Sequence, residues 1–459
     1  MAVEEHTADG PLGVRGGLDR AGPGRDAGGR RGVAIGARLV SVVGLVAVVV
    51  LGYRYATAPG GSSVGAANGE LVALLLALLV VVAAASVVVF RPERGEVGPL
   101  AKTAAVWTAA LLGTLAALWF LIDADVREEI GAGTPVFDRA EVEAYLGRTL
   151  PGGGATPPLL VPTGVLLQSI EFLNANNVKV SGFVWQRYDA SLPADLTKGV
   201  VLPEAVDGAY QATQAYAVEE NGAQVVGWRI DATLRQAFDY GRFPFDRQDV
   251  WLRLWPQEVD RDVVLVPDFG AYAATSPSSL PGLDPRFVYG GWTPEYAGFS
   301  YADDGAATAL GFGDGSGGAT YPDLFFNVGL KRDFLGPFFD HIVLAVAVAL
   351  LLFVVLALTT NDDDLQRRFG FNTAGVVGST SGLLFAVILK HSQIRGAIGS
   401  SHIAYLEVLP FVLYLFVVLV ALNAILLAAP IDVGPIEYKK NLLPTLAYWP
   451  ALLAALLVA

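Results

Sequence analysis

Cysteine is absent from the 459 residues, and methionine and histidine are scarce, with one and four copies. Without cysteine the chain forms no disulfide bond, and a metal site would depend on oxygen or imidazole ligands. The histidines are far apart, and none pairs with another at the spacing of metal ligands: His6, His341, His391 and His402. No glycine-rich nucleotide-binding pattern follows a predicted strand. These absences predict a protein that is not an enzyme and has no cofactor.

Charged residues are also few. They make up 16% of the chain, whereas 53% is apolar and the mean hydropathy is +0.48. A soluble globular protein of this length does not contain so much apolar sequence, so the class is integral membrane protein. The net charge of −13 is concentrated in residues 123–330, which contain 28 acids and 13 bases. This acidic block argues against a nucleic-acid partner and is compatible with attraction of cations, although a solvated surface is the ordinary explanation.

Seven apolar runs are long enough to cross a lipid bilayer as helices, which takes roughly 20 residues. Three form an N-terminal transmembrane region (33–122) and four form a C-terminal helical domain (338–459). The runs are 33–51, 71–90, 103–122, 338–358, 371–389, 403–427 and 442–458. Residues 1–32 are rich in glycine and arginine and are predicted to be a disordered cytoplasmic tail.

Basic residues near the spans fall on one side of the membrane, and such residues mark the cytoplasmic side. They are Arg15, Arg20, Arg25, Arg30, Arg31, Arg38, Arg91, Arg94, Lys102, Arg367, Arg368, Lys439 and Lys440; Lys390 and Arg395 are the exceptions on the outer side. The prediction is a multi-pass protein of the plasma (inner) membrane with a cytoplasmic N-terminus, and with residues 123–337 and the C-terminus outside. A rival interpretation takes Arg30-Arg31, the first run and Ala56-Thr57-Ala58 as a cleaved twin-arginine signal, although Pro59 fits that pattern poorly.

The stretch between the third and fourth spans has the pattern of a β domain. Short segments of β-branched and aromatic residues alternate with Gly, Pro and Asp, which predicts a β-sandwich over 164–337. Residues 123–163 are predicted to be a linker with a short helix at 138–147 and a Pro/Gly stretch at 151–162. The predicted strands are 178–185, 225–232, 234–239, 250–255 and 263–266.

The turn before the strand at 250–255 is the most informative local pattern of the external region. Pro244 fixes its own φ and holds Phe243 extended, so Phe243 and Phe245 are presented on a stiff turn with the Asp246 carboxylate behind them. The alternative is an ordinary strand preceded by a proline turn.

The order of an external β domain, this turn, a short basic segment and four spans resembles the pentameric ligand-gated ion channels. This is the Cys-loop receptor superfamily, here in its bacterial, cysteine-free form, and the resemblance covers residues 164–459. Phe243-Pro244-Phe245-Asp246 is similar to the family's signature loop. The other matching positions are Gln248, Asp239, Leu202-Pro203-Glu204, Arg332 ahead of Gly336, and Gln236 and Val250, which stand where animal receptors have the loop cysteines. The resemblance implies a homopentamer in which a small-molecule or ion ligand gates passive ion conduction.

By the same resemblance, Asp246 pairs with Arg332 and couples movement of the sandwich to the helices, with Arg395 assigned to the same coupling. A charge pair at the membrane edge is effective because the local dielectric constant is low. The alternative is that both are solvated surface charges. The family often has an acid in the first strand turn, whereas this chain has Asn174-Ala175-Asn176-Asn177, so amide hydrogen bonds are expected there instead.

The fifth span is the predicted pore helix, because its cytoplasmic half is small and polar. Residues spaced seven apart share a helix face, which favours a hydrated lumen with an apolar gate. The alternative is a packing face, since Gly378 and Gly382 have the spacing of close helix contacts. The charges near the inner mouth, Asp362 to Asp364 and Arg367-Arg368, favour opposite ions, while the acidic outer domain favours cations. The predicted lining is Thr373, Val377, Thr380, Leu384 and Val387.

Aromatic residues of the external region could hold an amine ligand by cation–π contacts, although such residues are more often part of a core. Acid pairs at Asp260/Asp262 and Asp303/Asp304 could bind calcium, but no twelve-residue calcium-loop pattern is present. The ligand-binding candidates are Trp185, Trp228, Trp292, Tyr296 and Tyr301.

Two other functions fit a protein of this class. One is a membrane-bound sensor whose external domain signals through a partner, although no cytoplasmic stretch after residue 32 is long enough for an output domain. The other is a transporter, but the spans show no internal repeat. The three N-terminal spans are not required by the resemblance, and they could be a peripheral bundle, a docking unit or a brake on the fourth span.

Overall fold

The computed structural model describes residue 81 and residues 96–124, 131–150, 157–286, 289–302, 321–360, 372–398, 403–430, 433–439 and 441–458. The chain divides into two compact units, Met1–Leu118 and Trp119–Ala459. The tail predicted at 1–32, the first two predicted spans and the alternative cleavage site lie outside the described residues.

Helix α3 (Val97–Ala124) continues from the first unit into the second. It contains the predicted span 103–122 and is longer at both ends. Three threonine hydroxyls along it donate to carbonyls one turn earlier, which satisfies these polar groups inside the helix itself, as an apolar environment requires.

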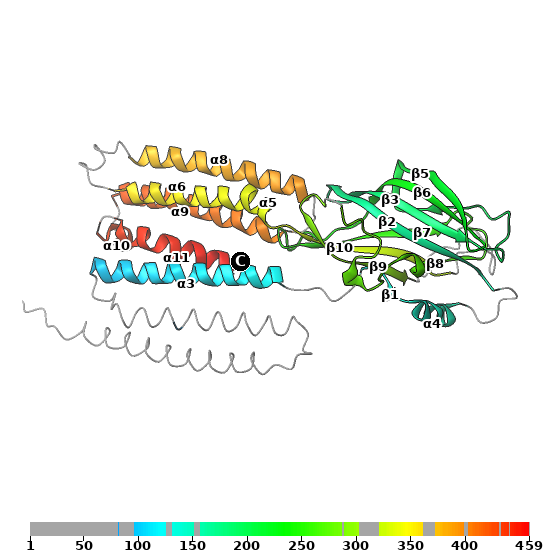
Figure 1. Cartoon of the computed structure of the whole chain (residues 1–459). Helices are drawn as coiled ribbons and strands as arrows, with labels where there is room; N and C mark the ends of the chain where they lie inside the picture. Colours follow the sequence, from blue (N-terminus) through cyan, green and yellow to red (C-terminus); the bar gives the residue numbers. More distant parts are fainter. Residues whose placement is uncertain are drawn as a thin grey trace, which may run out of the picture. The chain divides into compact units, whose positions relative to one another are not determined.

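Two five-stranded sheets form a β-sandwich in the second unit (Figure 1). Neighbouring strands are antiparallel, except that β2 and β8 are parallel. Buried residues from both sheets share one hydrophobic core, so the predicted sandwich is confirmed. The first sheet has the order β1 (Thr134–Val136), β9 (Trp292–Ala302), β10 (Asp323–Arg332), β7 (Arg247–Pro256), β4 (Val200–Val201). The second has the order β5 (Ala205–Glu220), β6 (Ala223–Arg235), β3 (Asn177–Tyr188), β2 (Leu159–Asn174), β8 (Val263–Pro267).

Alternating burial explains why these segments are strands. Every second side chain of β3 is buried, and the same alternation runs along β7 as far as Leu254. Val250, Leu252 and Leu254 are at most 1% exposed, so they form the inward face of β7 that the alternation predicts. The strand predicted at 234–239 is a strand only as far as Arg235, where β6 ends.

Much of the predicted linker belongs to the sandwich. Strand β1 pairs with β9, and α4 (Arg139–Thr149) begins at Asp138, whose carboxylate accepts the backbone N–H of Glu141 as an N-cap. Val136, Val142 and Leu146 join the core. The sandwich also starts before residue 164, because β2 begins at Leu159 and pairs there with β8. Proline-rich composition concealed this pairing, which joins residues about a hundred positions apart.

The C-terminal helices lie side by side as a bundle (Figure 1). Their buried faces meet in a second apolar cluster that includes Leu352, Leu413 and Leu452. Helix α8 continues past the predicted end at residue 389, so Lys390 and Arg395 are helical and not part of an outer loop. The elements are α5 (Leu335–Pro337), a π-helical turn (Phe338–Ile342), α6 (Val343–Leu358), α8 (Thr373–Ile398), a 3-10 turn (Tyr405–Glu407), α9 (Val408–Ala428), α10 (Gly434–Glu437) and α11 (Leu442–Val458).

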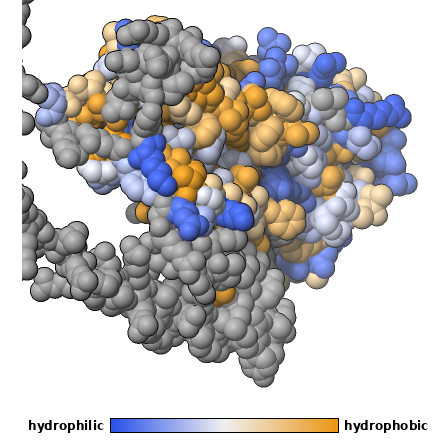
Figure 2. All heavy atoms as spheres, turned by 90° about the vertical axis from the view of Figure 1, so that its left-hand side faces the viewer, coloured by the Kyte–Doolittle hydropathy of each residue, from blue (hydrophilic) through white to orange (hydrophobic). Residues whose placement is uncertain are grey.

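Four helices in the described part of the chain are long and apolar enough to cross a membrane: Val97–Asp123, Leu335–Leu358, Thr373–Gly396 and Tyr405–Ala428. Helix α11 is apolar but shorter. Large apolar side chains of the bundle are exposed, such as Leu351 at 53%, Leu415 at 52% and Val418 at 56%. Figure 2 shows apolar areas on the face that it presents, with hydrophilic residues both near its centre and along its right-hand side. Lipid contact accounts for such exposure, and the protein is a membrane protein.

Asn441 holds three helices of the bundle together. It is 1% exposed, and its amide group donates to the carbonyls of Leu356 and Thr359 at 3.2 Å each. Its side-chain oxygen accepts from Asn423 of α9 at 3.0 Å. The φ of Asn441 is 74°, a left-handed conformation that asparagine tolerates better than most residues. One side chain thereby caps the end of α6, bonds to α9 and starts α11.

Replacing this side chain should destabilise the bundle. Asn441→Ala removes the hydrogen bonds that this side chain makes with the Asn423 amide and with the carbonyls of Leu356 and Thr359, and the expected loss is about 1–3 kcal/mol. Thermal unfolding in detergent should show a lower midpoint. The exposed Asn176→Ala variant is the matched control and should unfold like the wild type; equal midpoints for both variants would contradict the role of Asn441.

Candidate functional site

The proline turn (residues 240–246) connects β6 to β7 and is bonded to the bundle through its backbone. Within the turn, Phe243 N–H donates to the Tyr240 carbonyl at 3.0 Å, and the Phe243–Pro244 peptide bond is cis. Two further bonds leave the turn: Tyr405 N–H donates to the Gly241 carbonyl at 2.9 Å, and Leu406 N–H donates to the Phe243 carbonyl at 3.1 Å. The turn is therefore hydrogen-bonded directly to the connection between α8 and α9.

The two phenylalanine rings of the turn are buried at this contact. Phe243 and Phe245 are 8% and 5% exposed, and the Phe245 ring stacks on Phe334 with centroids 5.1 Å apart. Phe243 lies in one apolar cluster with Ile342 at the start of α6 and Ile394 near the end of α8. Burying such a ring contributes roughly 1.5–3 kcal/mol. The turn is thus anchored by apolar contacts as well as by hydrogen bonds.

Asp246 and Arg332 are in direct contact. Arg332 Nε donates to Asp246 Oδ1 at 2.6 Å and Arg332 Nη2 donates to Asp246 Oδ2 at 2.9 Å, which is a bidentate pair. The Asp246 side chain is 1% exposed, so it is not a solvated surface charge. The guanidinium also lies over two rings, 4.1 Å from the Trp292 centroid and 4.9 Å from that of Phe243. Burial next to this pair raises the pKa of Tyr240 to about 12.

Gln248 and Gln236 hold the rest of the loop. Gln248 Nε2 donates to Asp246 Oδ2 at 2.8 Å and to the Asp239 carbonyl at 2.7 Å, and its oxygen accepts the Asp239 N–H. Gln236 is buried, and its amide group donates to the Trp251 carbonyl and accepts the Trp251 N–H. Trp251 in β7 is therefore joined by hydrogen bonds to Gln236, which directly follows β6.

Arg395 lies at the same end of the bundle and is paired with a different acid. Its Nη1 is 3.2 Å from Glu407 Oε1, and Glu407 is 1% exposed. The pair connects the end of α8 to the start of α9, next to the two residues that bond to the proline turn. The asparagine turn approaches the same apolar cluster through Ala175, while Asn174 accepts a hydrogen bond within its own turn at 3.1 Å.

The predicted lining of α8 mixes two faces of the helix. Thr380 and Val387 are 2% and 5% exposed and pack against helices of the same chain, so the prediction is wrong for these two. Threonine fits there because its hydroxyl donates to the Val376 carbonyl at 2.9 Å. Thr373 and Leu384 are half-buried, and Val377 is exposed. The exposed residues of α8 are Ala374, Val377, Gly378, Ser381, Gly382, Phe385, Ile388, Leu389, Ser392, Gln393, Arg395 and Gly396.

Three of the aromatic residues assigned to ligand binding lie in the interior. Trp292, Tyr296 and Tyr301 are 8%, 9% and 0% exposed. Tyr301 donates to the Leu265 carbonyl at 2.9 Å, and Trp292 stacks on Phe172. The structure contradicts an accessible site made of these three residues.

Trp185 and Trp228 are half-buried and lie in the second sheet. Trp185 Nε1 donates to Asp268 Oδ2 at 3.0 Å, and its ring covers Gly164, where a Cβ would be only 2.2 Å from the ring. Trp228 packs against the sandwich core. These two remain partly accessible to a ligand.

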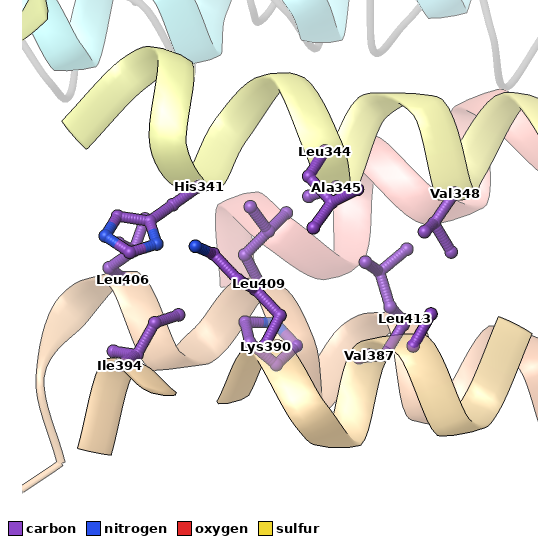
Figure 3. Close-up of a pocket in the computed structure, with 12 residues that line it drawn as sticks. His341, Leu344, Ala345, Val348, Val387, Lys390, Ile394, Leu406, Leu409 and Leu413 are labelled. Atoms are coloured by element: carbon purple, nitrogen blue, oxygen red, sulfur yellow. The ribbon is translucent and has the colours of Figure 1, made fainter. Parts of the chain in front are cut away.

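A cavity lies within the bundle next to the proline turn (Figure 3). Its volume is about 20 Å³, and its walls are apolar apart from His341 and Lys390. Figure 3 shows the Lys390 amino group turned toward the His341 ring.

Metal binding has no support in the described part of the chain, which contains no cluster of three or more His, Asp or Glu side chains. Asp303/Asp304, the inner-mouth acids Asp362 to Asp364 and Arg367-Arg368 lie outside the described residues.

Some residues at the junction were not expected from the sequence. Glu407 carries a sequence signal that predicts a paired acid, because an acid inside an apolar run is costly unless it has a partner. Tyr405 and Trp119 had none, since their contacts join parts of the chain far apart in sequence. No protein-family model matches the chain, and no curated protein matches it.

The Asp246–Arg332 pair should behave as a buried pair. Arg332→Met leaves the Asp246 carboxylate buried without its cation, and the expected loss of stability is about 3–5 kcal/mol. The double variant Asp246→Asn/Arg332→Met should lose less, because no charge remains unpaired. The exposed pair Arg139–Glu143 offers a control, and Arg139→Met should leave the unfolding midpoint unchanged. Additive effects of the two substitutions at Asp246 and Arg332 would show that the contact contributes nothing.

Proposed function

We propose that the chain is a subunit of a homopentameric ligand-gated ion channel in which the β-sandwich lies outside the membrane and controls passive conduction. The observation that carries this proposal is the bonded contact between the proline turn and the α8–α9 connection, where Tyr405 and Leu406 donate to the turn. A displaced turn must carry this connection with it or break both bonds. The resemblance in the turn and in the order of segments supports the same function.

Transmission needs a turn that does not deform before the helices move. The bidentate Asp246–Arg332 pair joins the turn to the end of β10, and β10 continues into α5 and α6. The turn therefore acts on α6 through Arg332 and on α8 and α9 through Tyr405 and Leu406. Both routes start from one rigid loop, so a tilt of the sandwich would reach all three helices together.

Conduction requires a closed ring, because one helix cannot enclose a water-filled path and rotational symmetry supplies the copies. We assign the lining to the exposed face of α8, which includes Val377, Ser381, Phe385 and Ile388 at helical spacing. Small and hydroxyl-bearing residues precede larger apolar ones along this face, an order that suits a hydrated segment and an apolar gate. The acidic external region favours cations.

The ligand is a small molecule or an ion. Trp185 and Trp228 are the candidate aromatic contacts that remain, since the other three are interior. We place the protein in a plasma (inner) membrane with the sandwich and the C-terminus outside and the N-terminus in the cytoplasm, as the distribution of basic residues indicates.

Subunit count tests the assembly. Native mass measurement of the purified protein should give five copies of the 48.3 kDa chain. A homogeneous monomer or dimer would contradict the proposal, because neither closes a ring around a path.

Flux tests the function and the face of α8 that lines the path. In liposomes the protein should give passive, unsaturable cation flux. The native chain has no cysteine, so a water-soluble thiol reagent will act only on an introduced thiol. The reagent should reduce flux strongly in Ser381→Cys and leave the control Leu351→Cys, on α6, unchanged. Saturable uptake would favour a carrier and absence of flux a sensor. Equal responses of both variants would reject the assigned face.

A further inference from the structure

The outer end of α3 lies against the proline turn and its partners. Trp119 to Ala124 are the residues of this helix that belong to the second unit together with the sandwich and the bundle. Trp119 Nε1 donates to the Tyr405 hydroxyl at 2.9 Å. Its ring also lies 6.1 Å from the ring of Phe245 and 6.1 Å from that of Phe334. One side chain thus contacts the turn, the α8–α9 connection and the segment that precedes α5.

Asp123 makes a second group of contacts, with the ends of two strands. Its backbone carbonyl accepts from Arg247 Nη2 at 3.0 Å and from Lys331 Nζ at 2.9 Å. Its carboxylate is also 2.9 Å from Lys331 Nζ. Arg247 follows Asp246 in the chain and Lys331 precedes Arg332. Asp123 is therefore bonded to the immediate neighbours of both members of the buried pair.

These contacts suit the end of a helix. The last carbonyls of a helix have no partner within it and carry partial negative charge, which cations stabilise. The last turn of α3 has no basic residue of its own. Two strands of the sandwich supply the missing cations instead, at the one place where α3 ends.

The rest of the described helix has polar groups of a different kind. The hydroxyls of Thr103, Thr108 and Thr114 donate to carbonyls of α3 itself. The polar contacts described above between α3 and other elements are made by Trp119 and Asp123. Their partners are Tyr405, Arg247 and Lys331. A helix that only anchored the chain in lipid would not need this arrangement.

We propose that the outer end of α3, Trp119 to Asp123, is a clamp that holds the proline turn and the α8–α9 connection in one arrangement. Withdrawal of Trp119 and Asp123 from these partners would release the clamp and free the proline turn and the α8–α9 connection to move separately. A contact present in only one of two arrangements shifts the equilibrium toward that arrangement. If the chain conducts as proposed above, the end of α3 sets the resting open fraction of the channel through this clamp; this consequence depends on the proposed function, whereas the clamp itself does not.

The test compares two identical substitutions in the same helix of the full-length protein. Trp119→Phe keeps an aromatic ring and removes the N–H that bonds to Tyr405, while Trp107→Phe is the matched control. Hydrogen–deuterium exchange in lipid nanodiscs would be followed at the amides of Tyr405 and Leu406. We expect exchange about fivefold faster in Trp119→Phe, the factor for loss of one hydrogen bond, and no change in Trp107→Phe. Unchanged exchange in Trp119→Phe, or equal acceleration in both variants, would overturn the clamp.

Two further measurements separate the clamp from simple packing. Tyr405→Phe should accelerate exchange at Leu406 as much as Trp119→Phe does, and the double variant should add nothing, because each removes the same bond. Additive acceleration would overturn the assignment of the bond. Asp123→Asn, which keeps the carbonyl and removes the charge, should also accelerate exchange, and wild-type exchange should rise with salt concentration.

Basal flux in liposomes then tests the regulatory consequence. Trp119→Phe should change basal flux severalfold while Trp107→Phe does not. A wild type that conducts and a Trp119→Phe variant with the same basal flux would overturn regulation by α3. A wild type that does not conduct would overturn the channel proposal alone, and the exchange result would still decide whether the clamp exists.

Discussion

The buried ion pair between Asp246 and Arg332 is the interaction on which the junction depends. A carboxylate at 1% exposure is costly unless its oxygens are bonded, and here they accept from Arg332 and Gln248. That geometry exists only when β7 and β10 are adjacent and in the observed register, with Lys331 opposite Arg247. The pair therefore links the pairing of two strands to the place where the chain enters the membrane helices.

Aromatic side chains pack around the Asp246–Arg332 pair. Phe243 and Trp292 cover the guanidinium, and Phe243 also contacts the ring of His341 at the start of the bundle. The charge pair, the rings and the backbone bonds to Tyr405 and Leu406 overlap in one small region. Each of these contacts restrains the same loop. Loss of one contact is therefore expected to weaken the others, so that the region responds as a unit.

Sequence patterns predicted the architecture better than they predicted the faces of its elements. The strand at 250–255 and the helix at 442–458 follow from local alternation and hydropathy, and both are present. Thr380 and Val387 were placed on the wrong side because polarity and spacing do not distinguish an exposed helix face from one turned to its own bundle. Tyr301 was misplaced for a similar reason, since a tyrosine whose hydroxyl finds a backbone carbonyl can be fully interior. The contacts of Trp119 join residues hundreds of positions apart, and no local pattern contains that information.

The amide of Gln236 closes the loop with two hydrogen bonds to Trp251 where a covalent bridge stands in the animal receptors that this chain resembles. Such closure forms as soon as the strands pair, without an electron acceptor or a thiol oxidoreductase. The same loop would form in a reducing compartment and in an oxidising one. With no cysteine in the chain, closure of this loop does not depend on the redox poise of its surroundings.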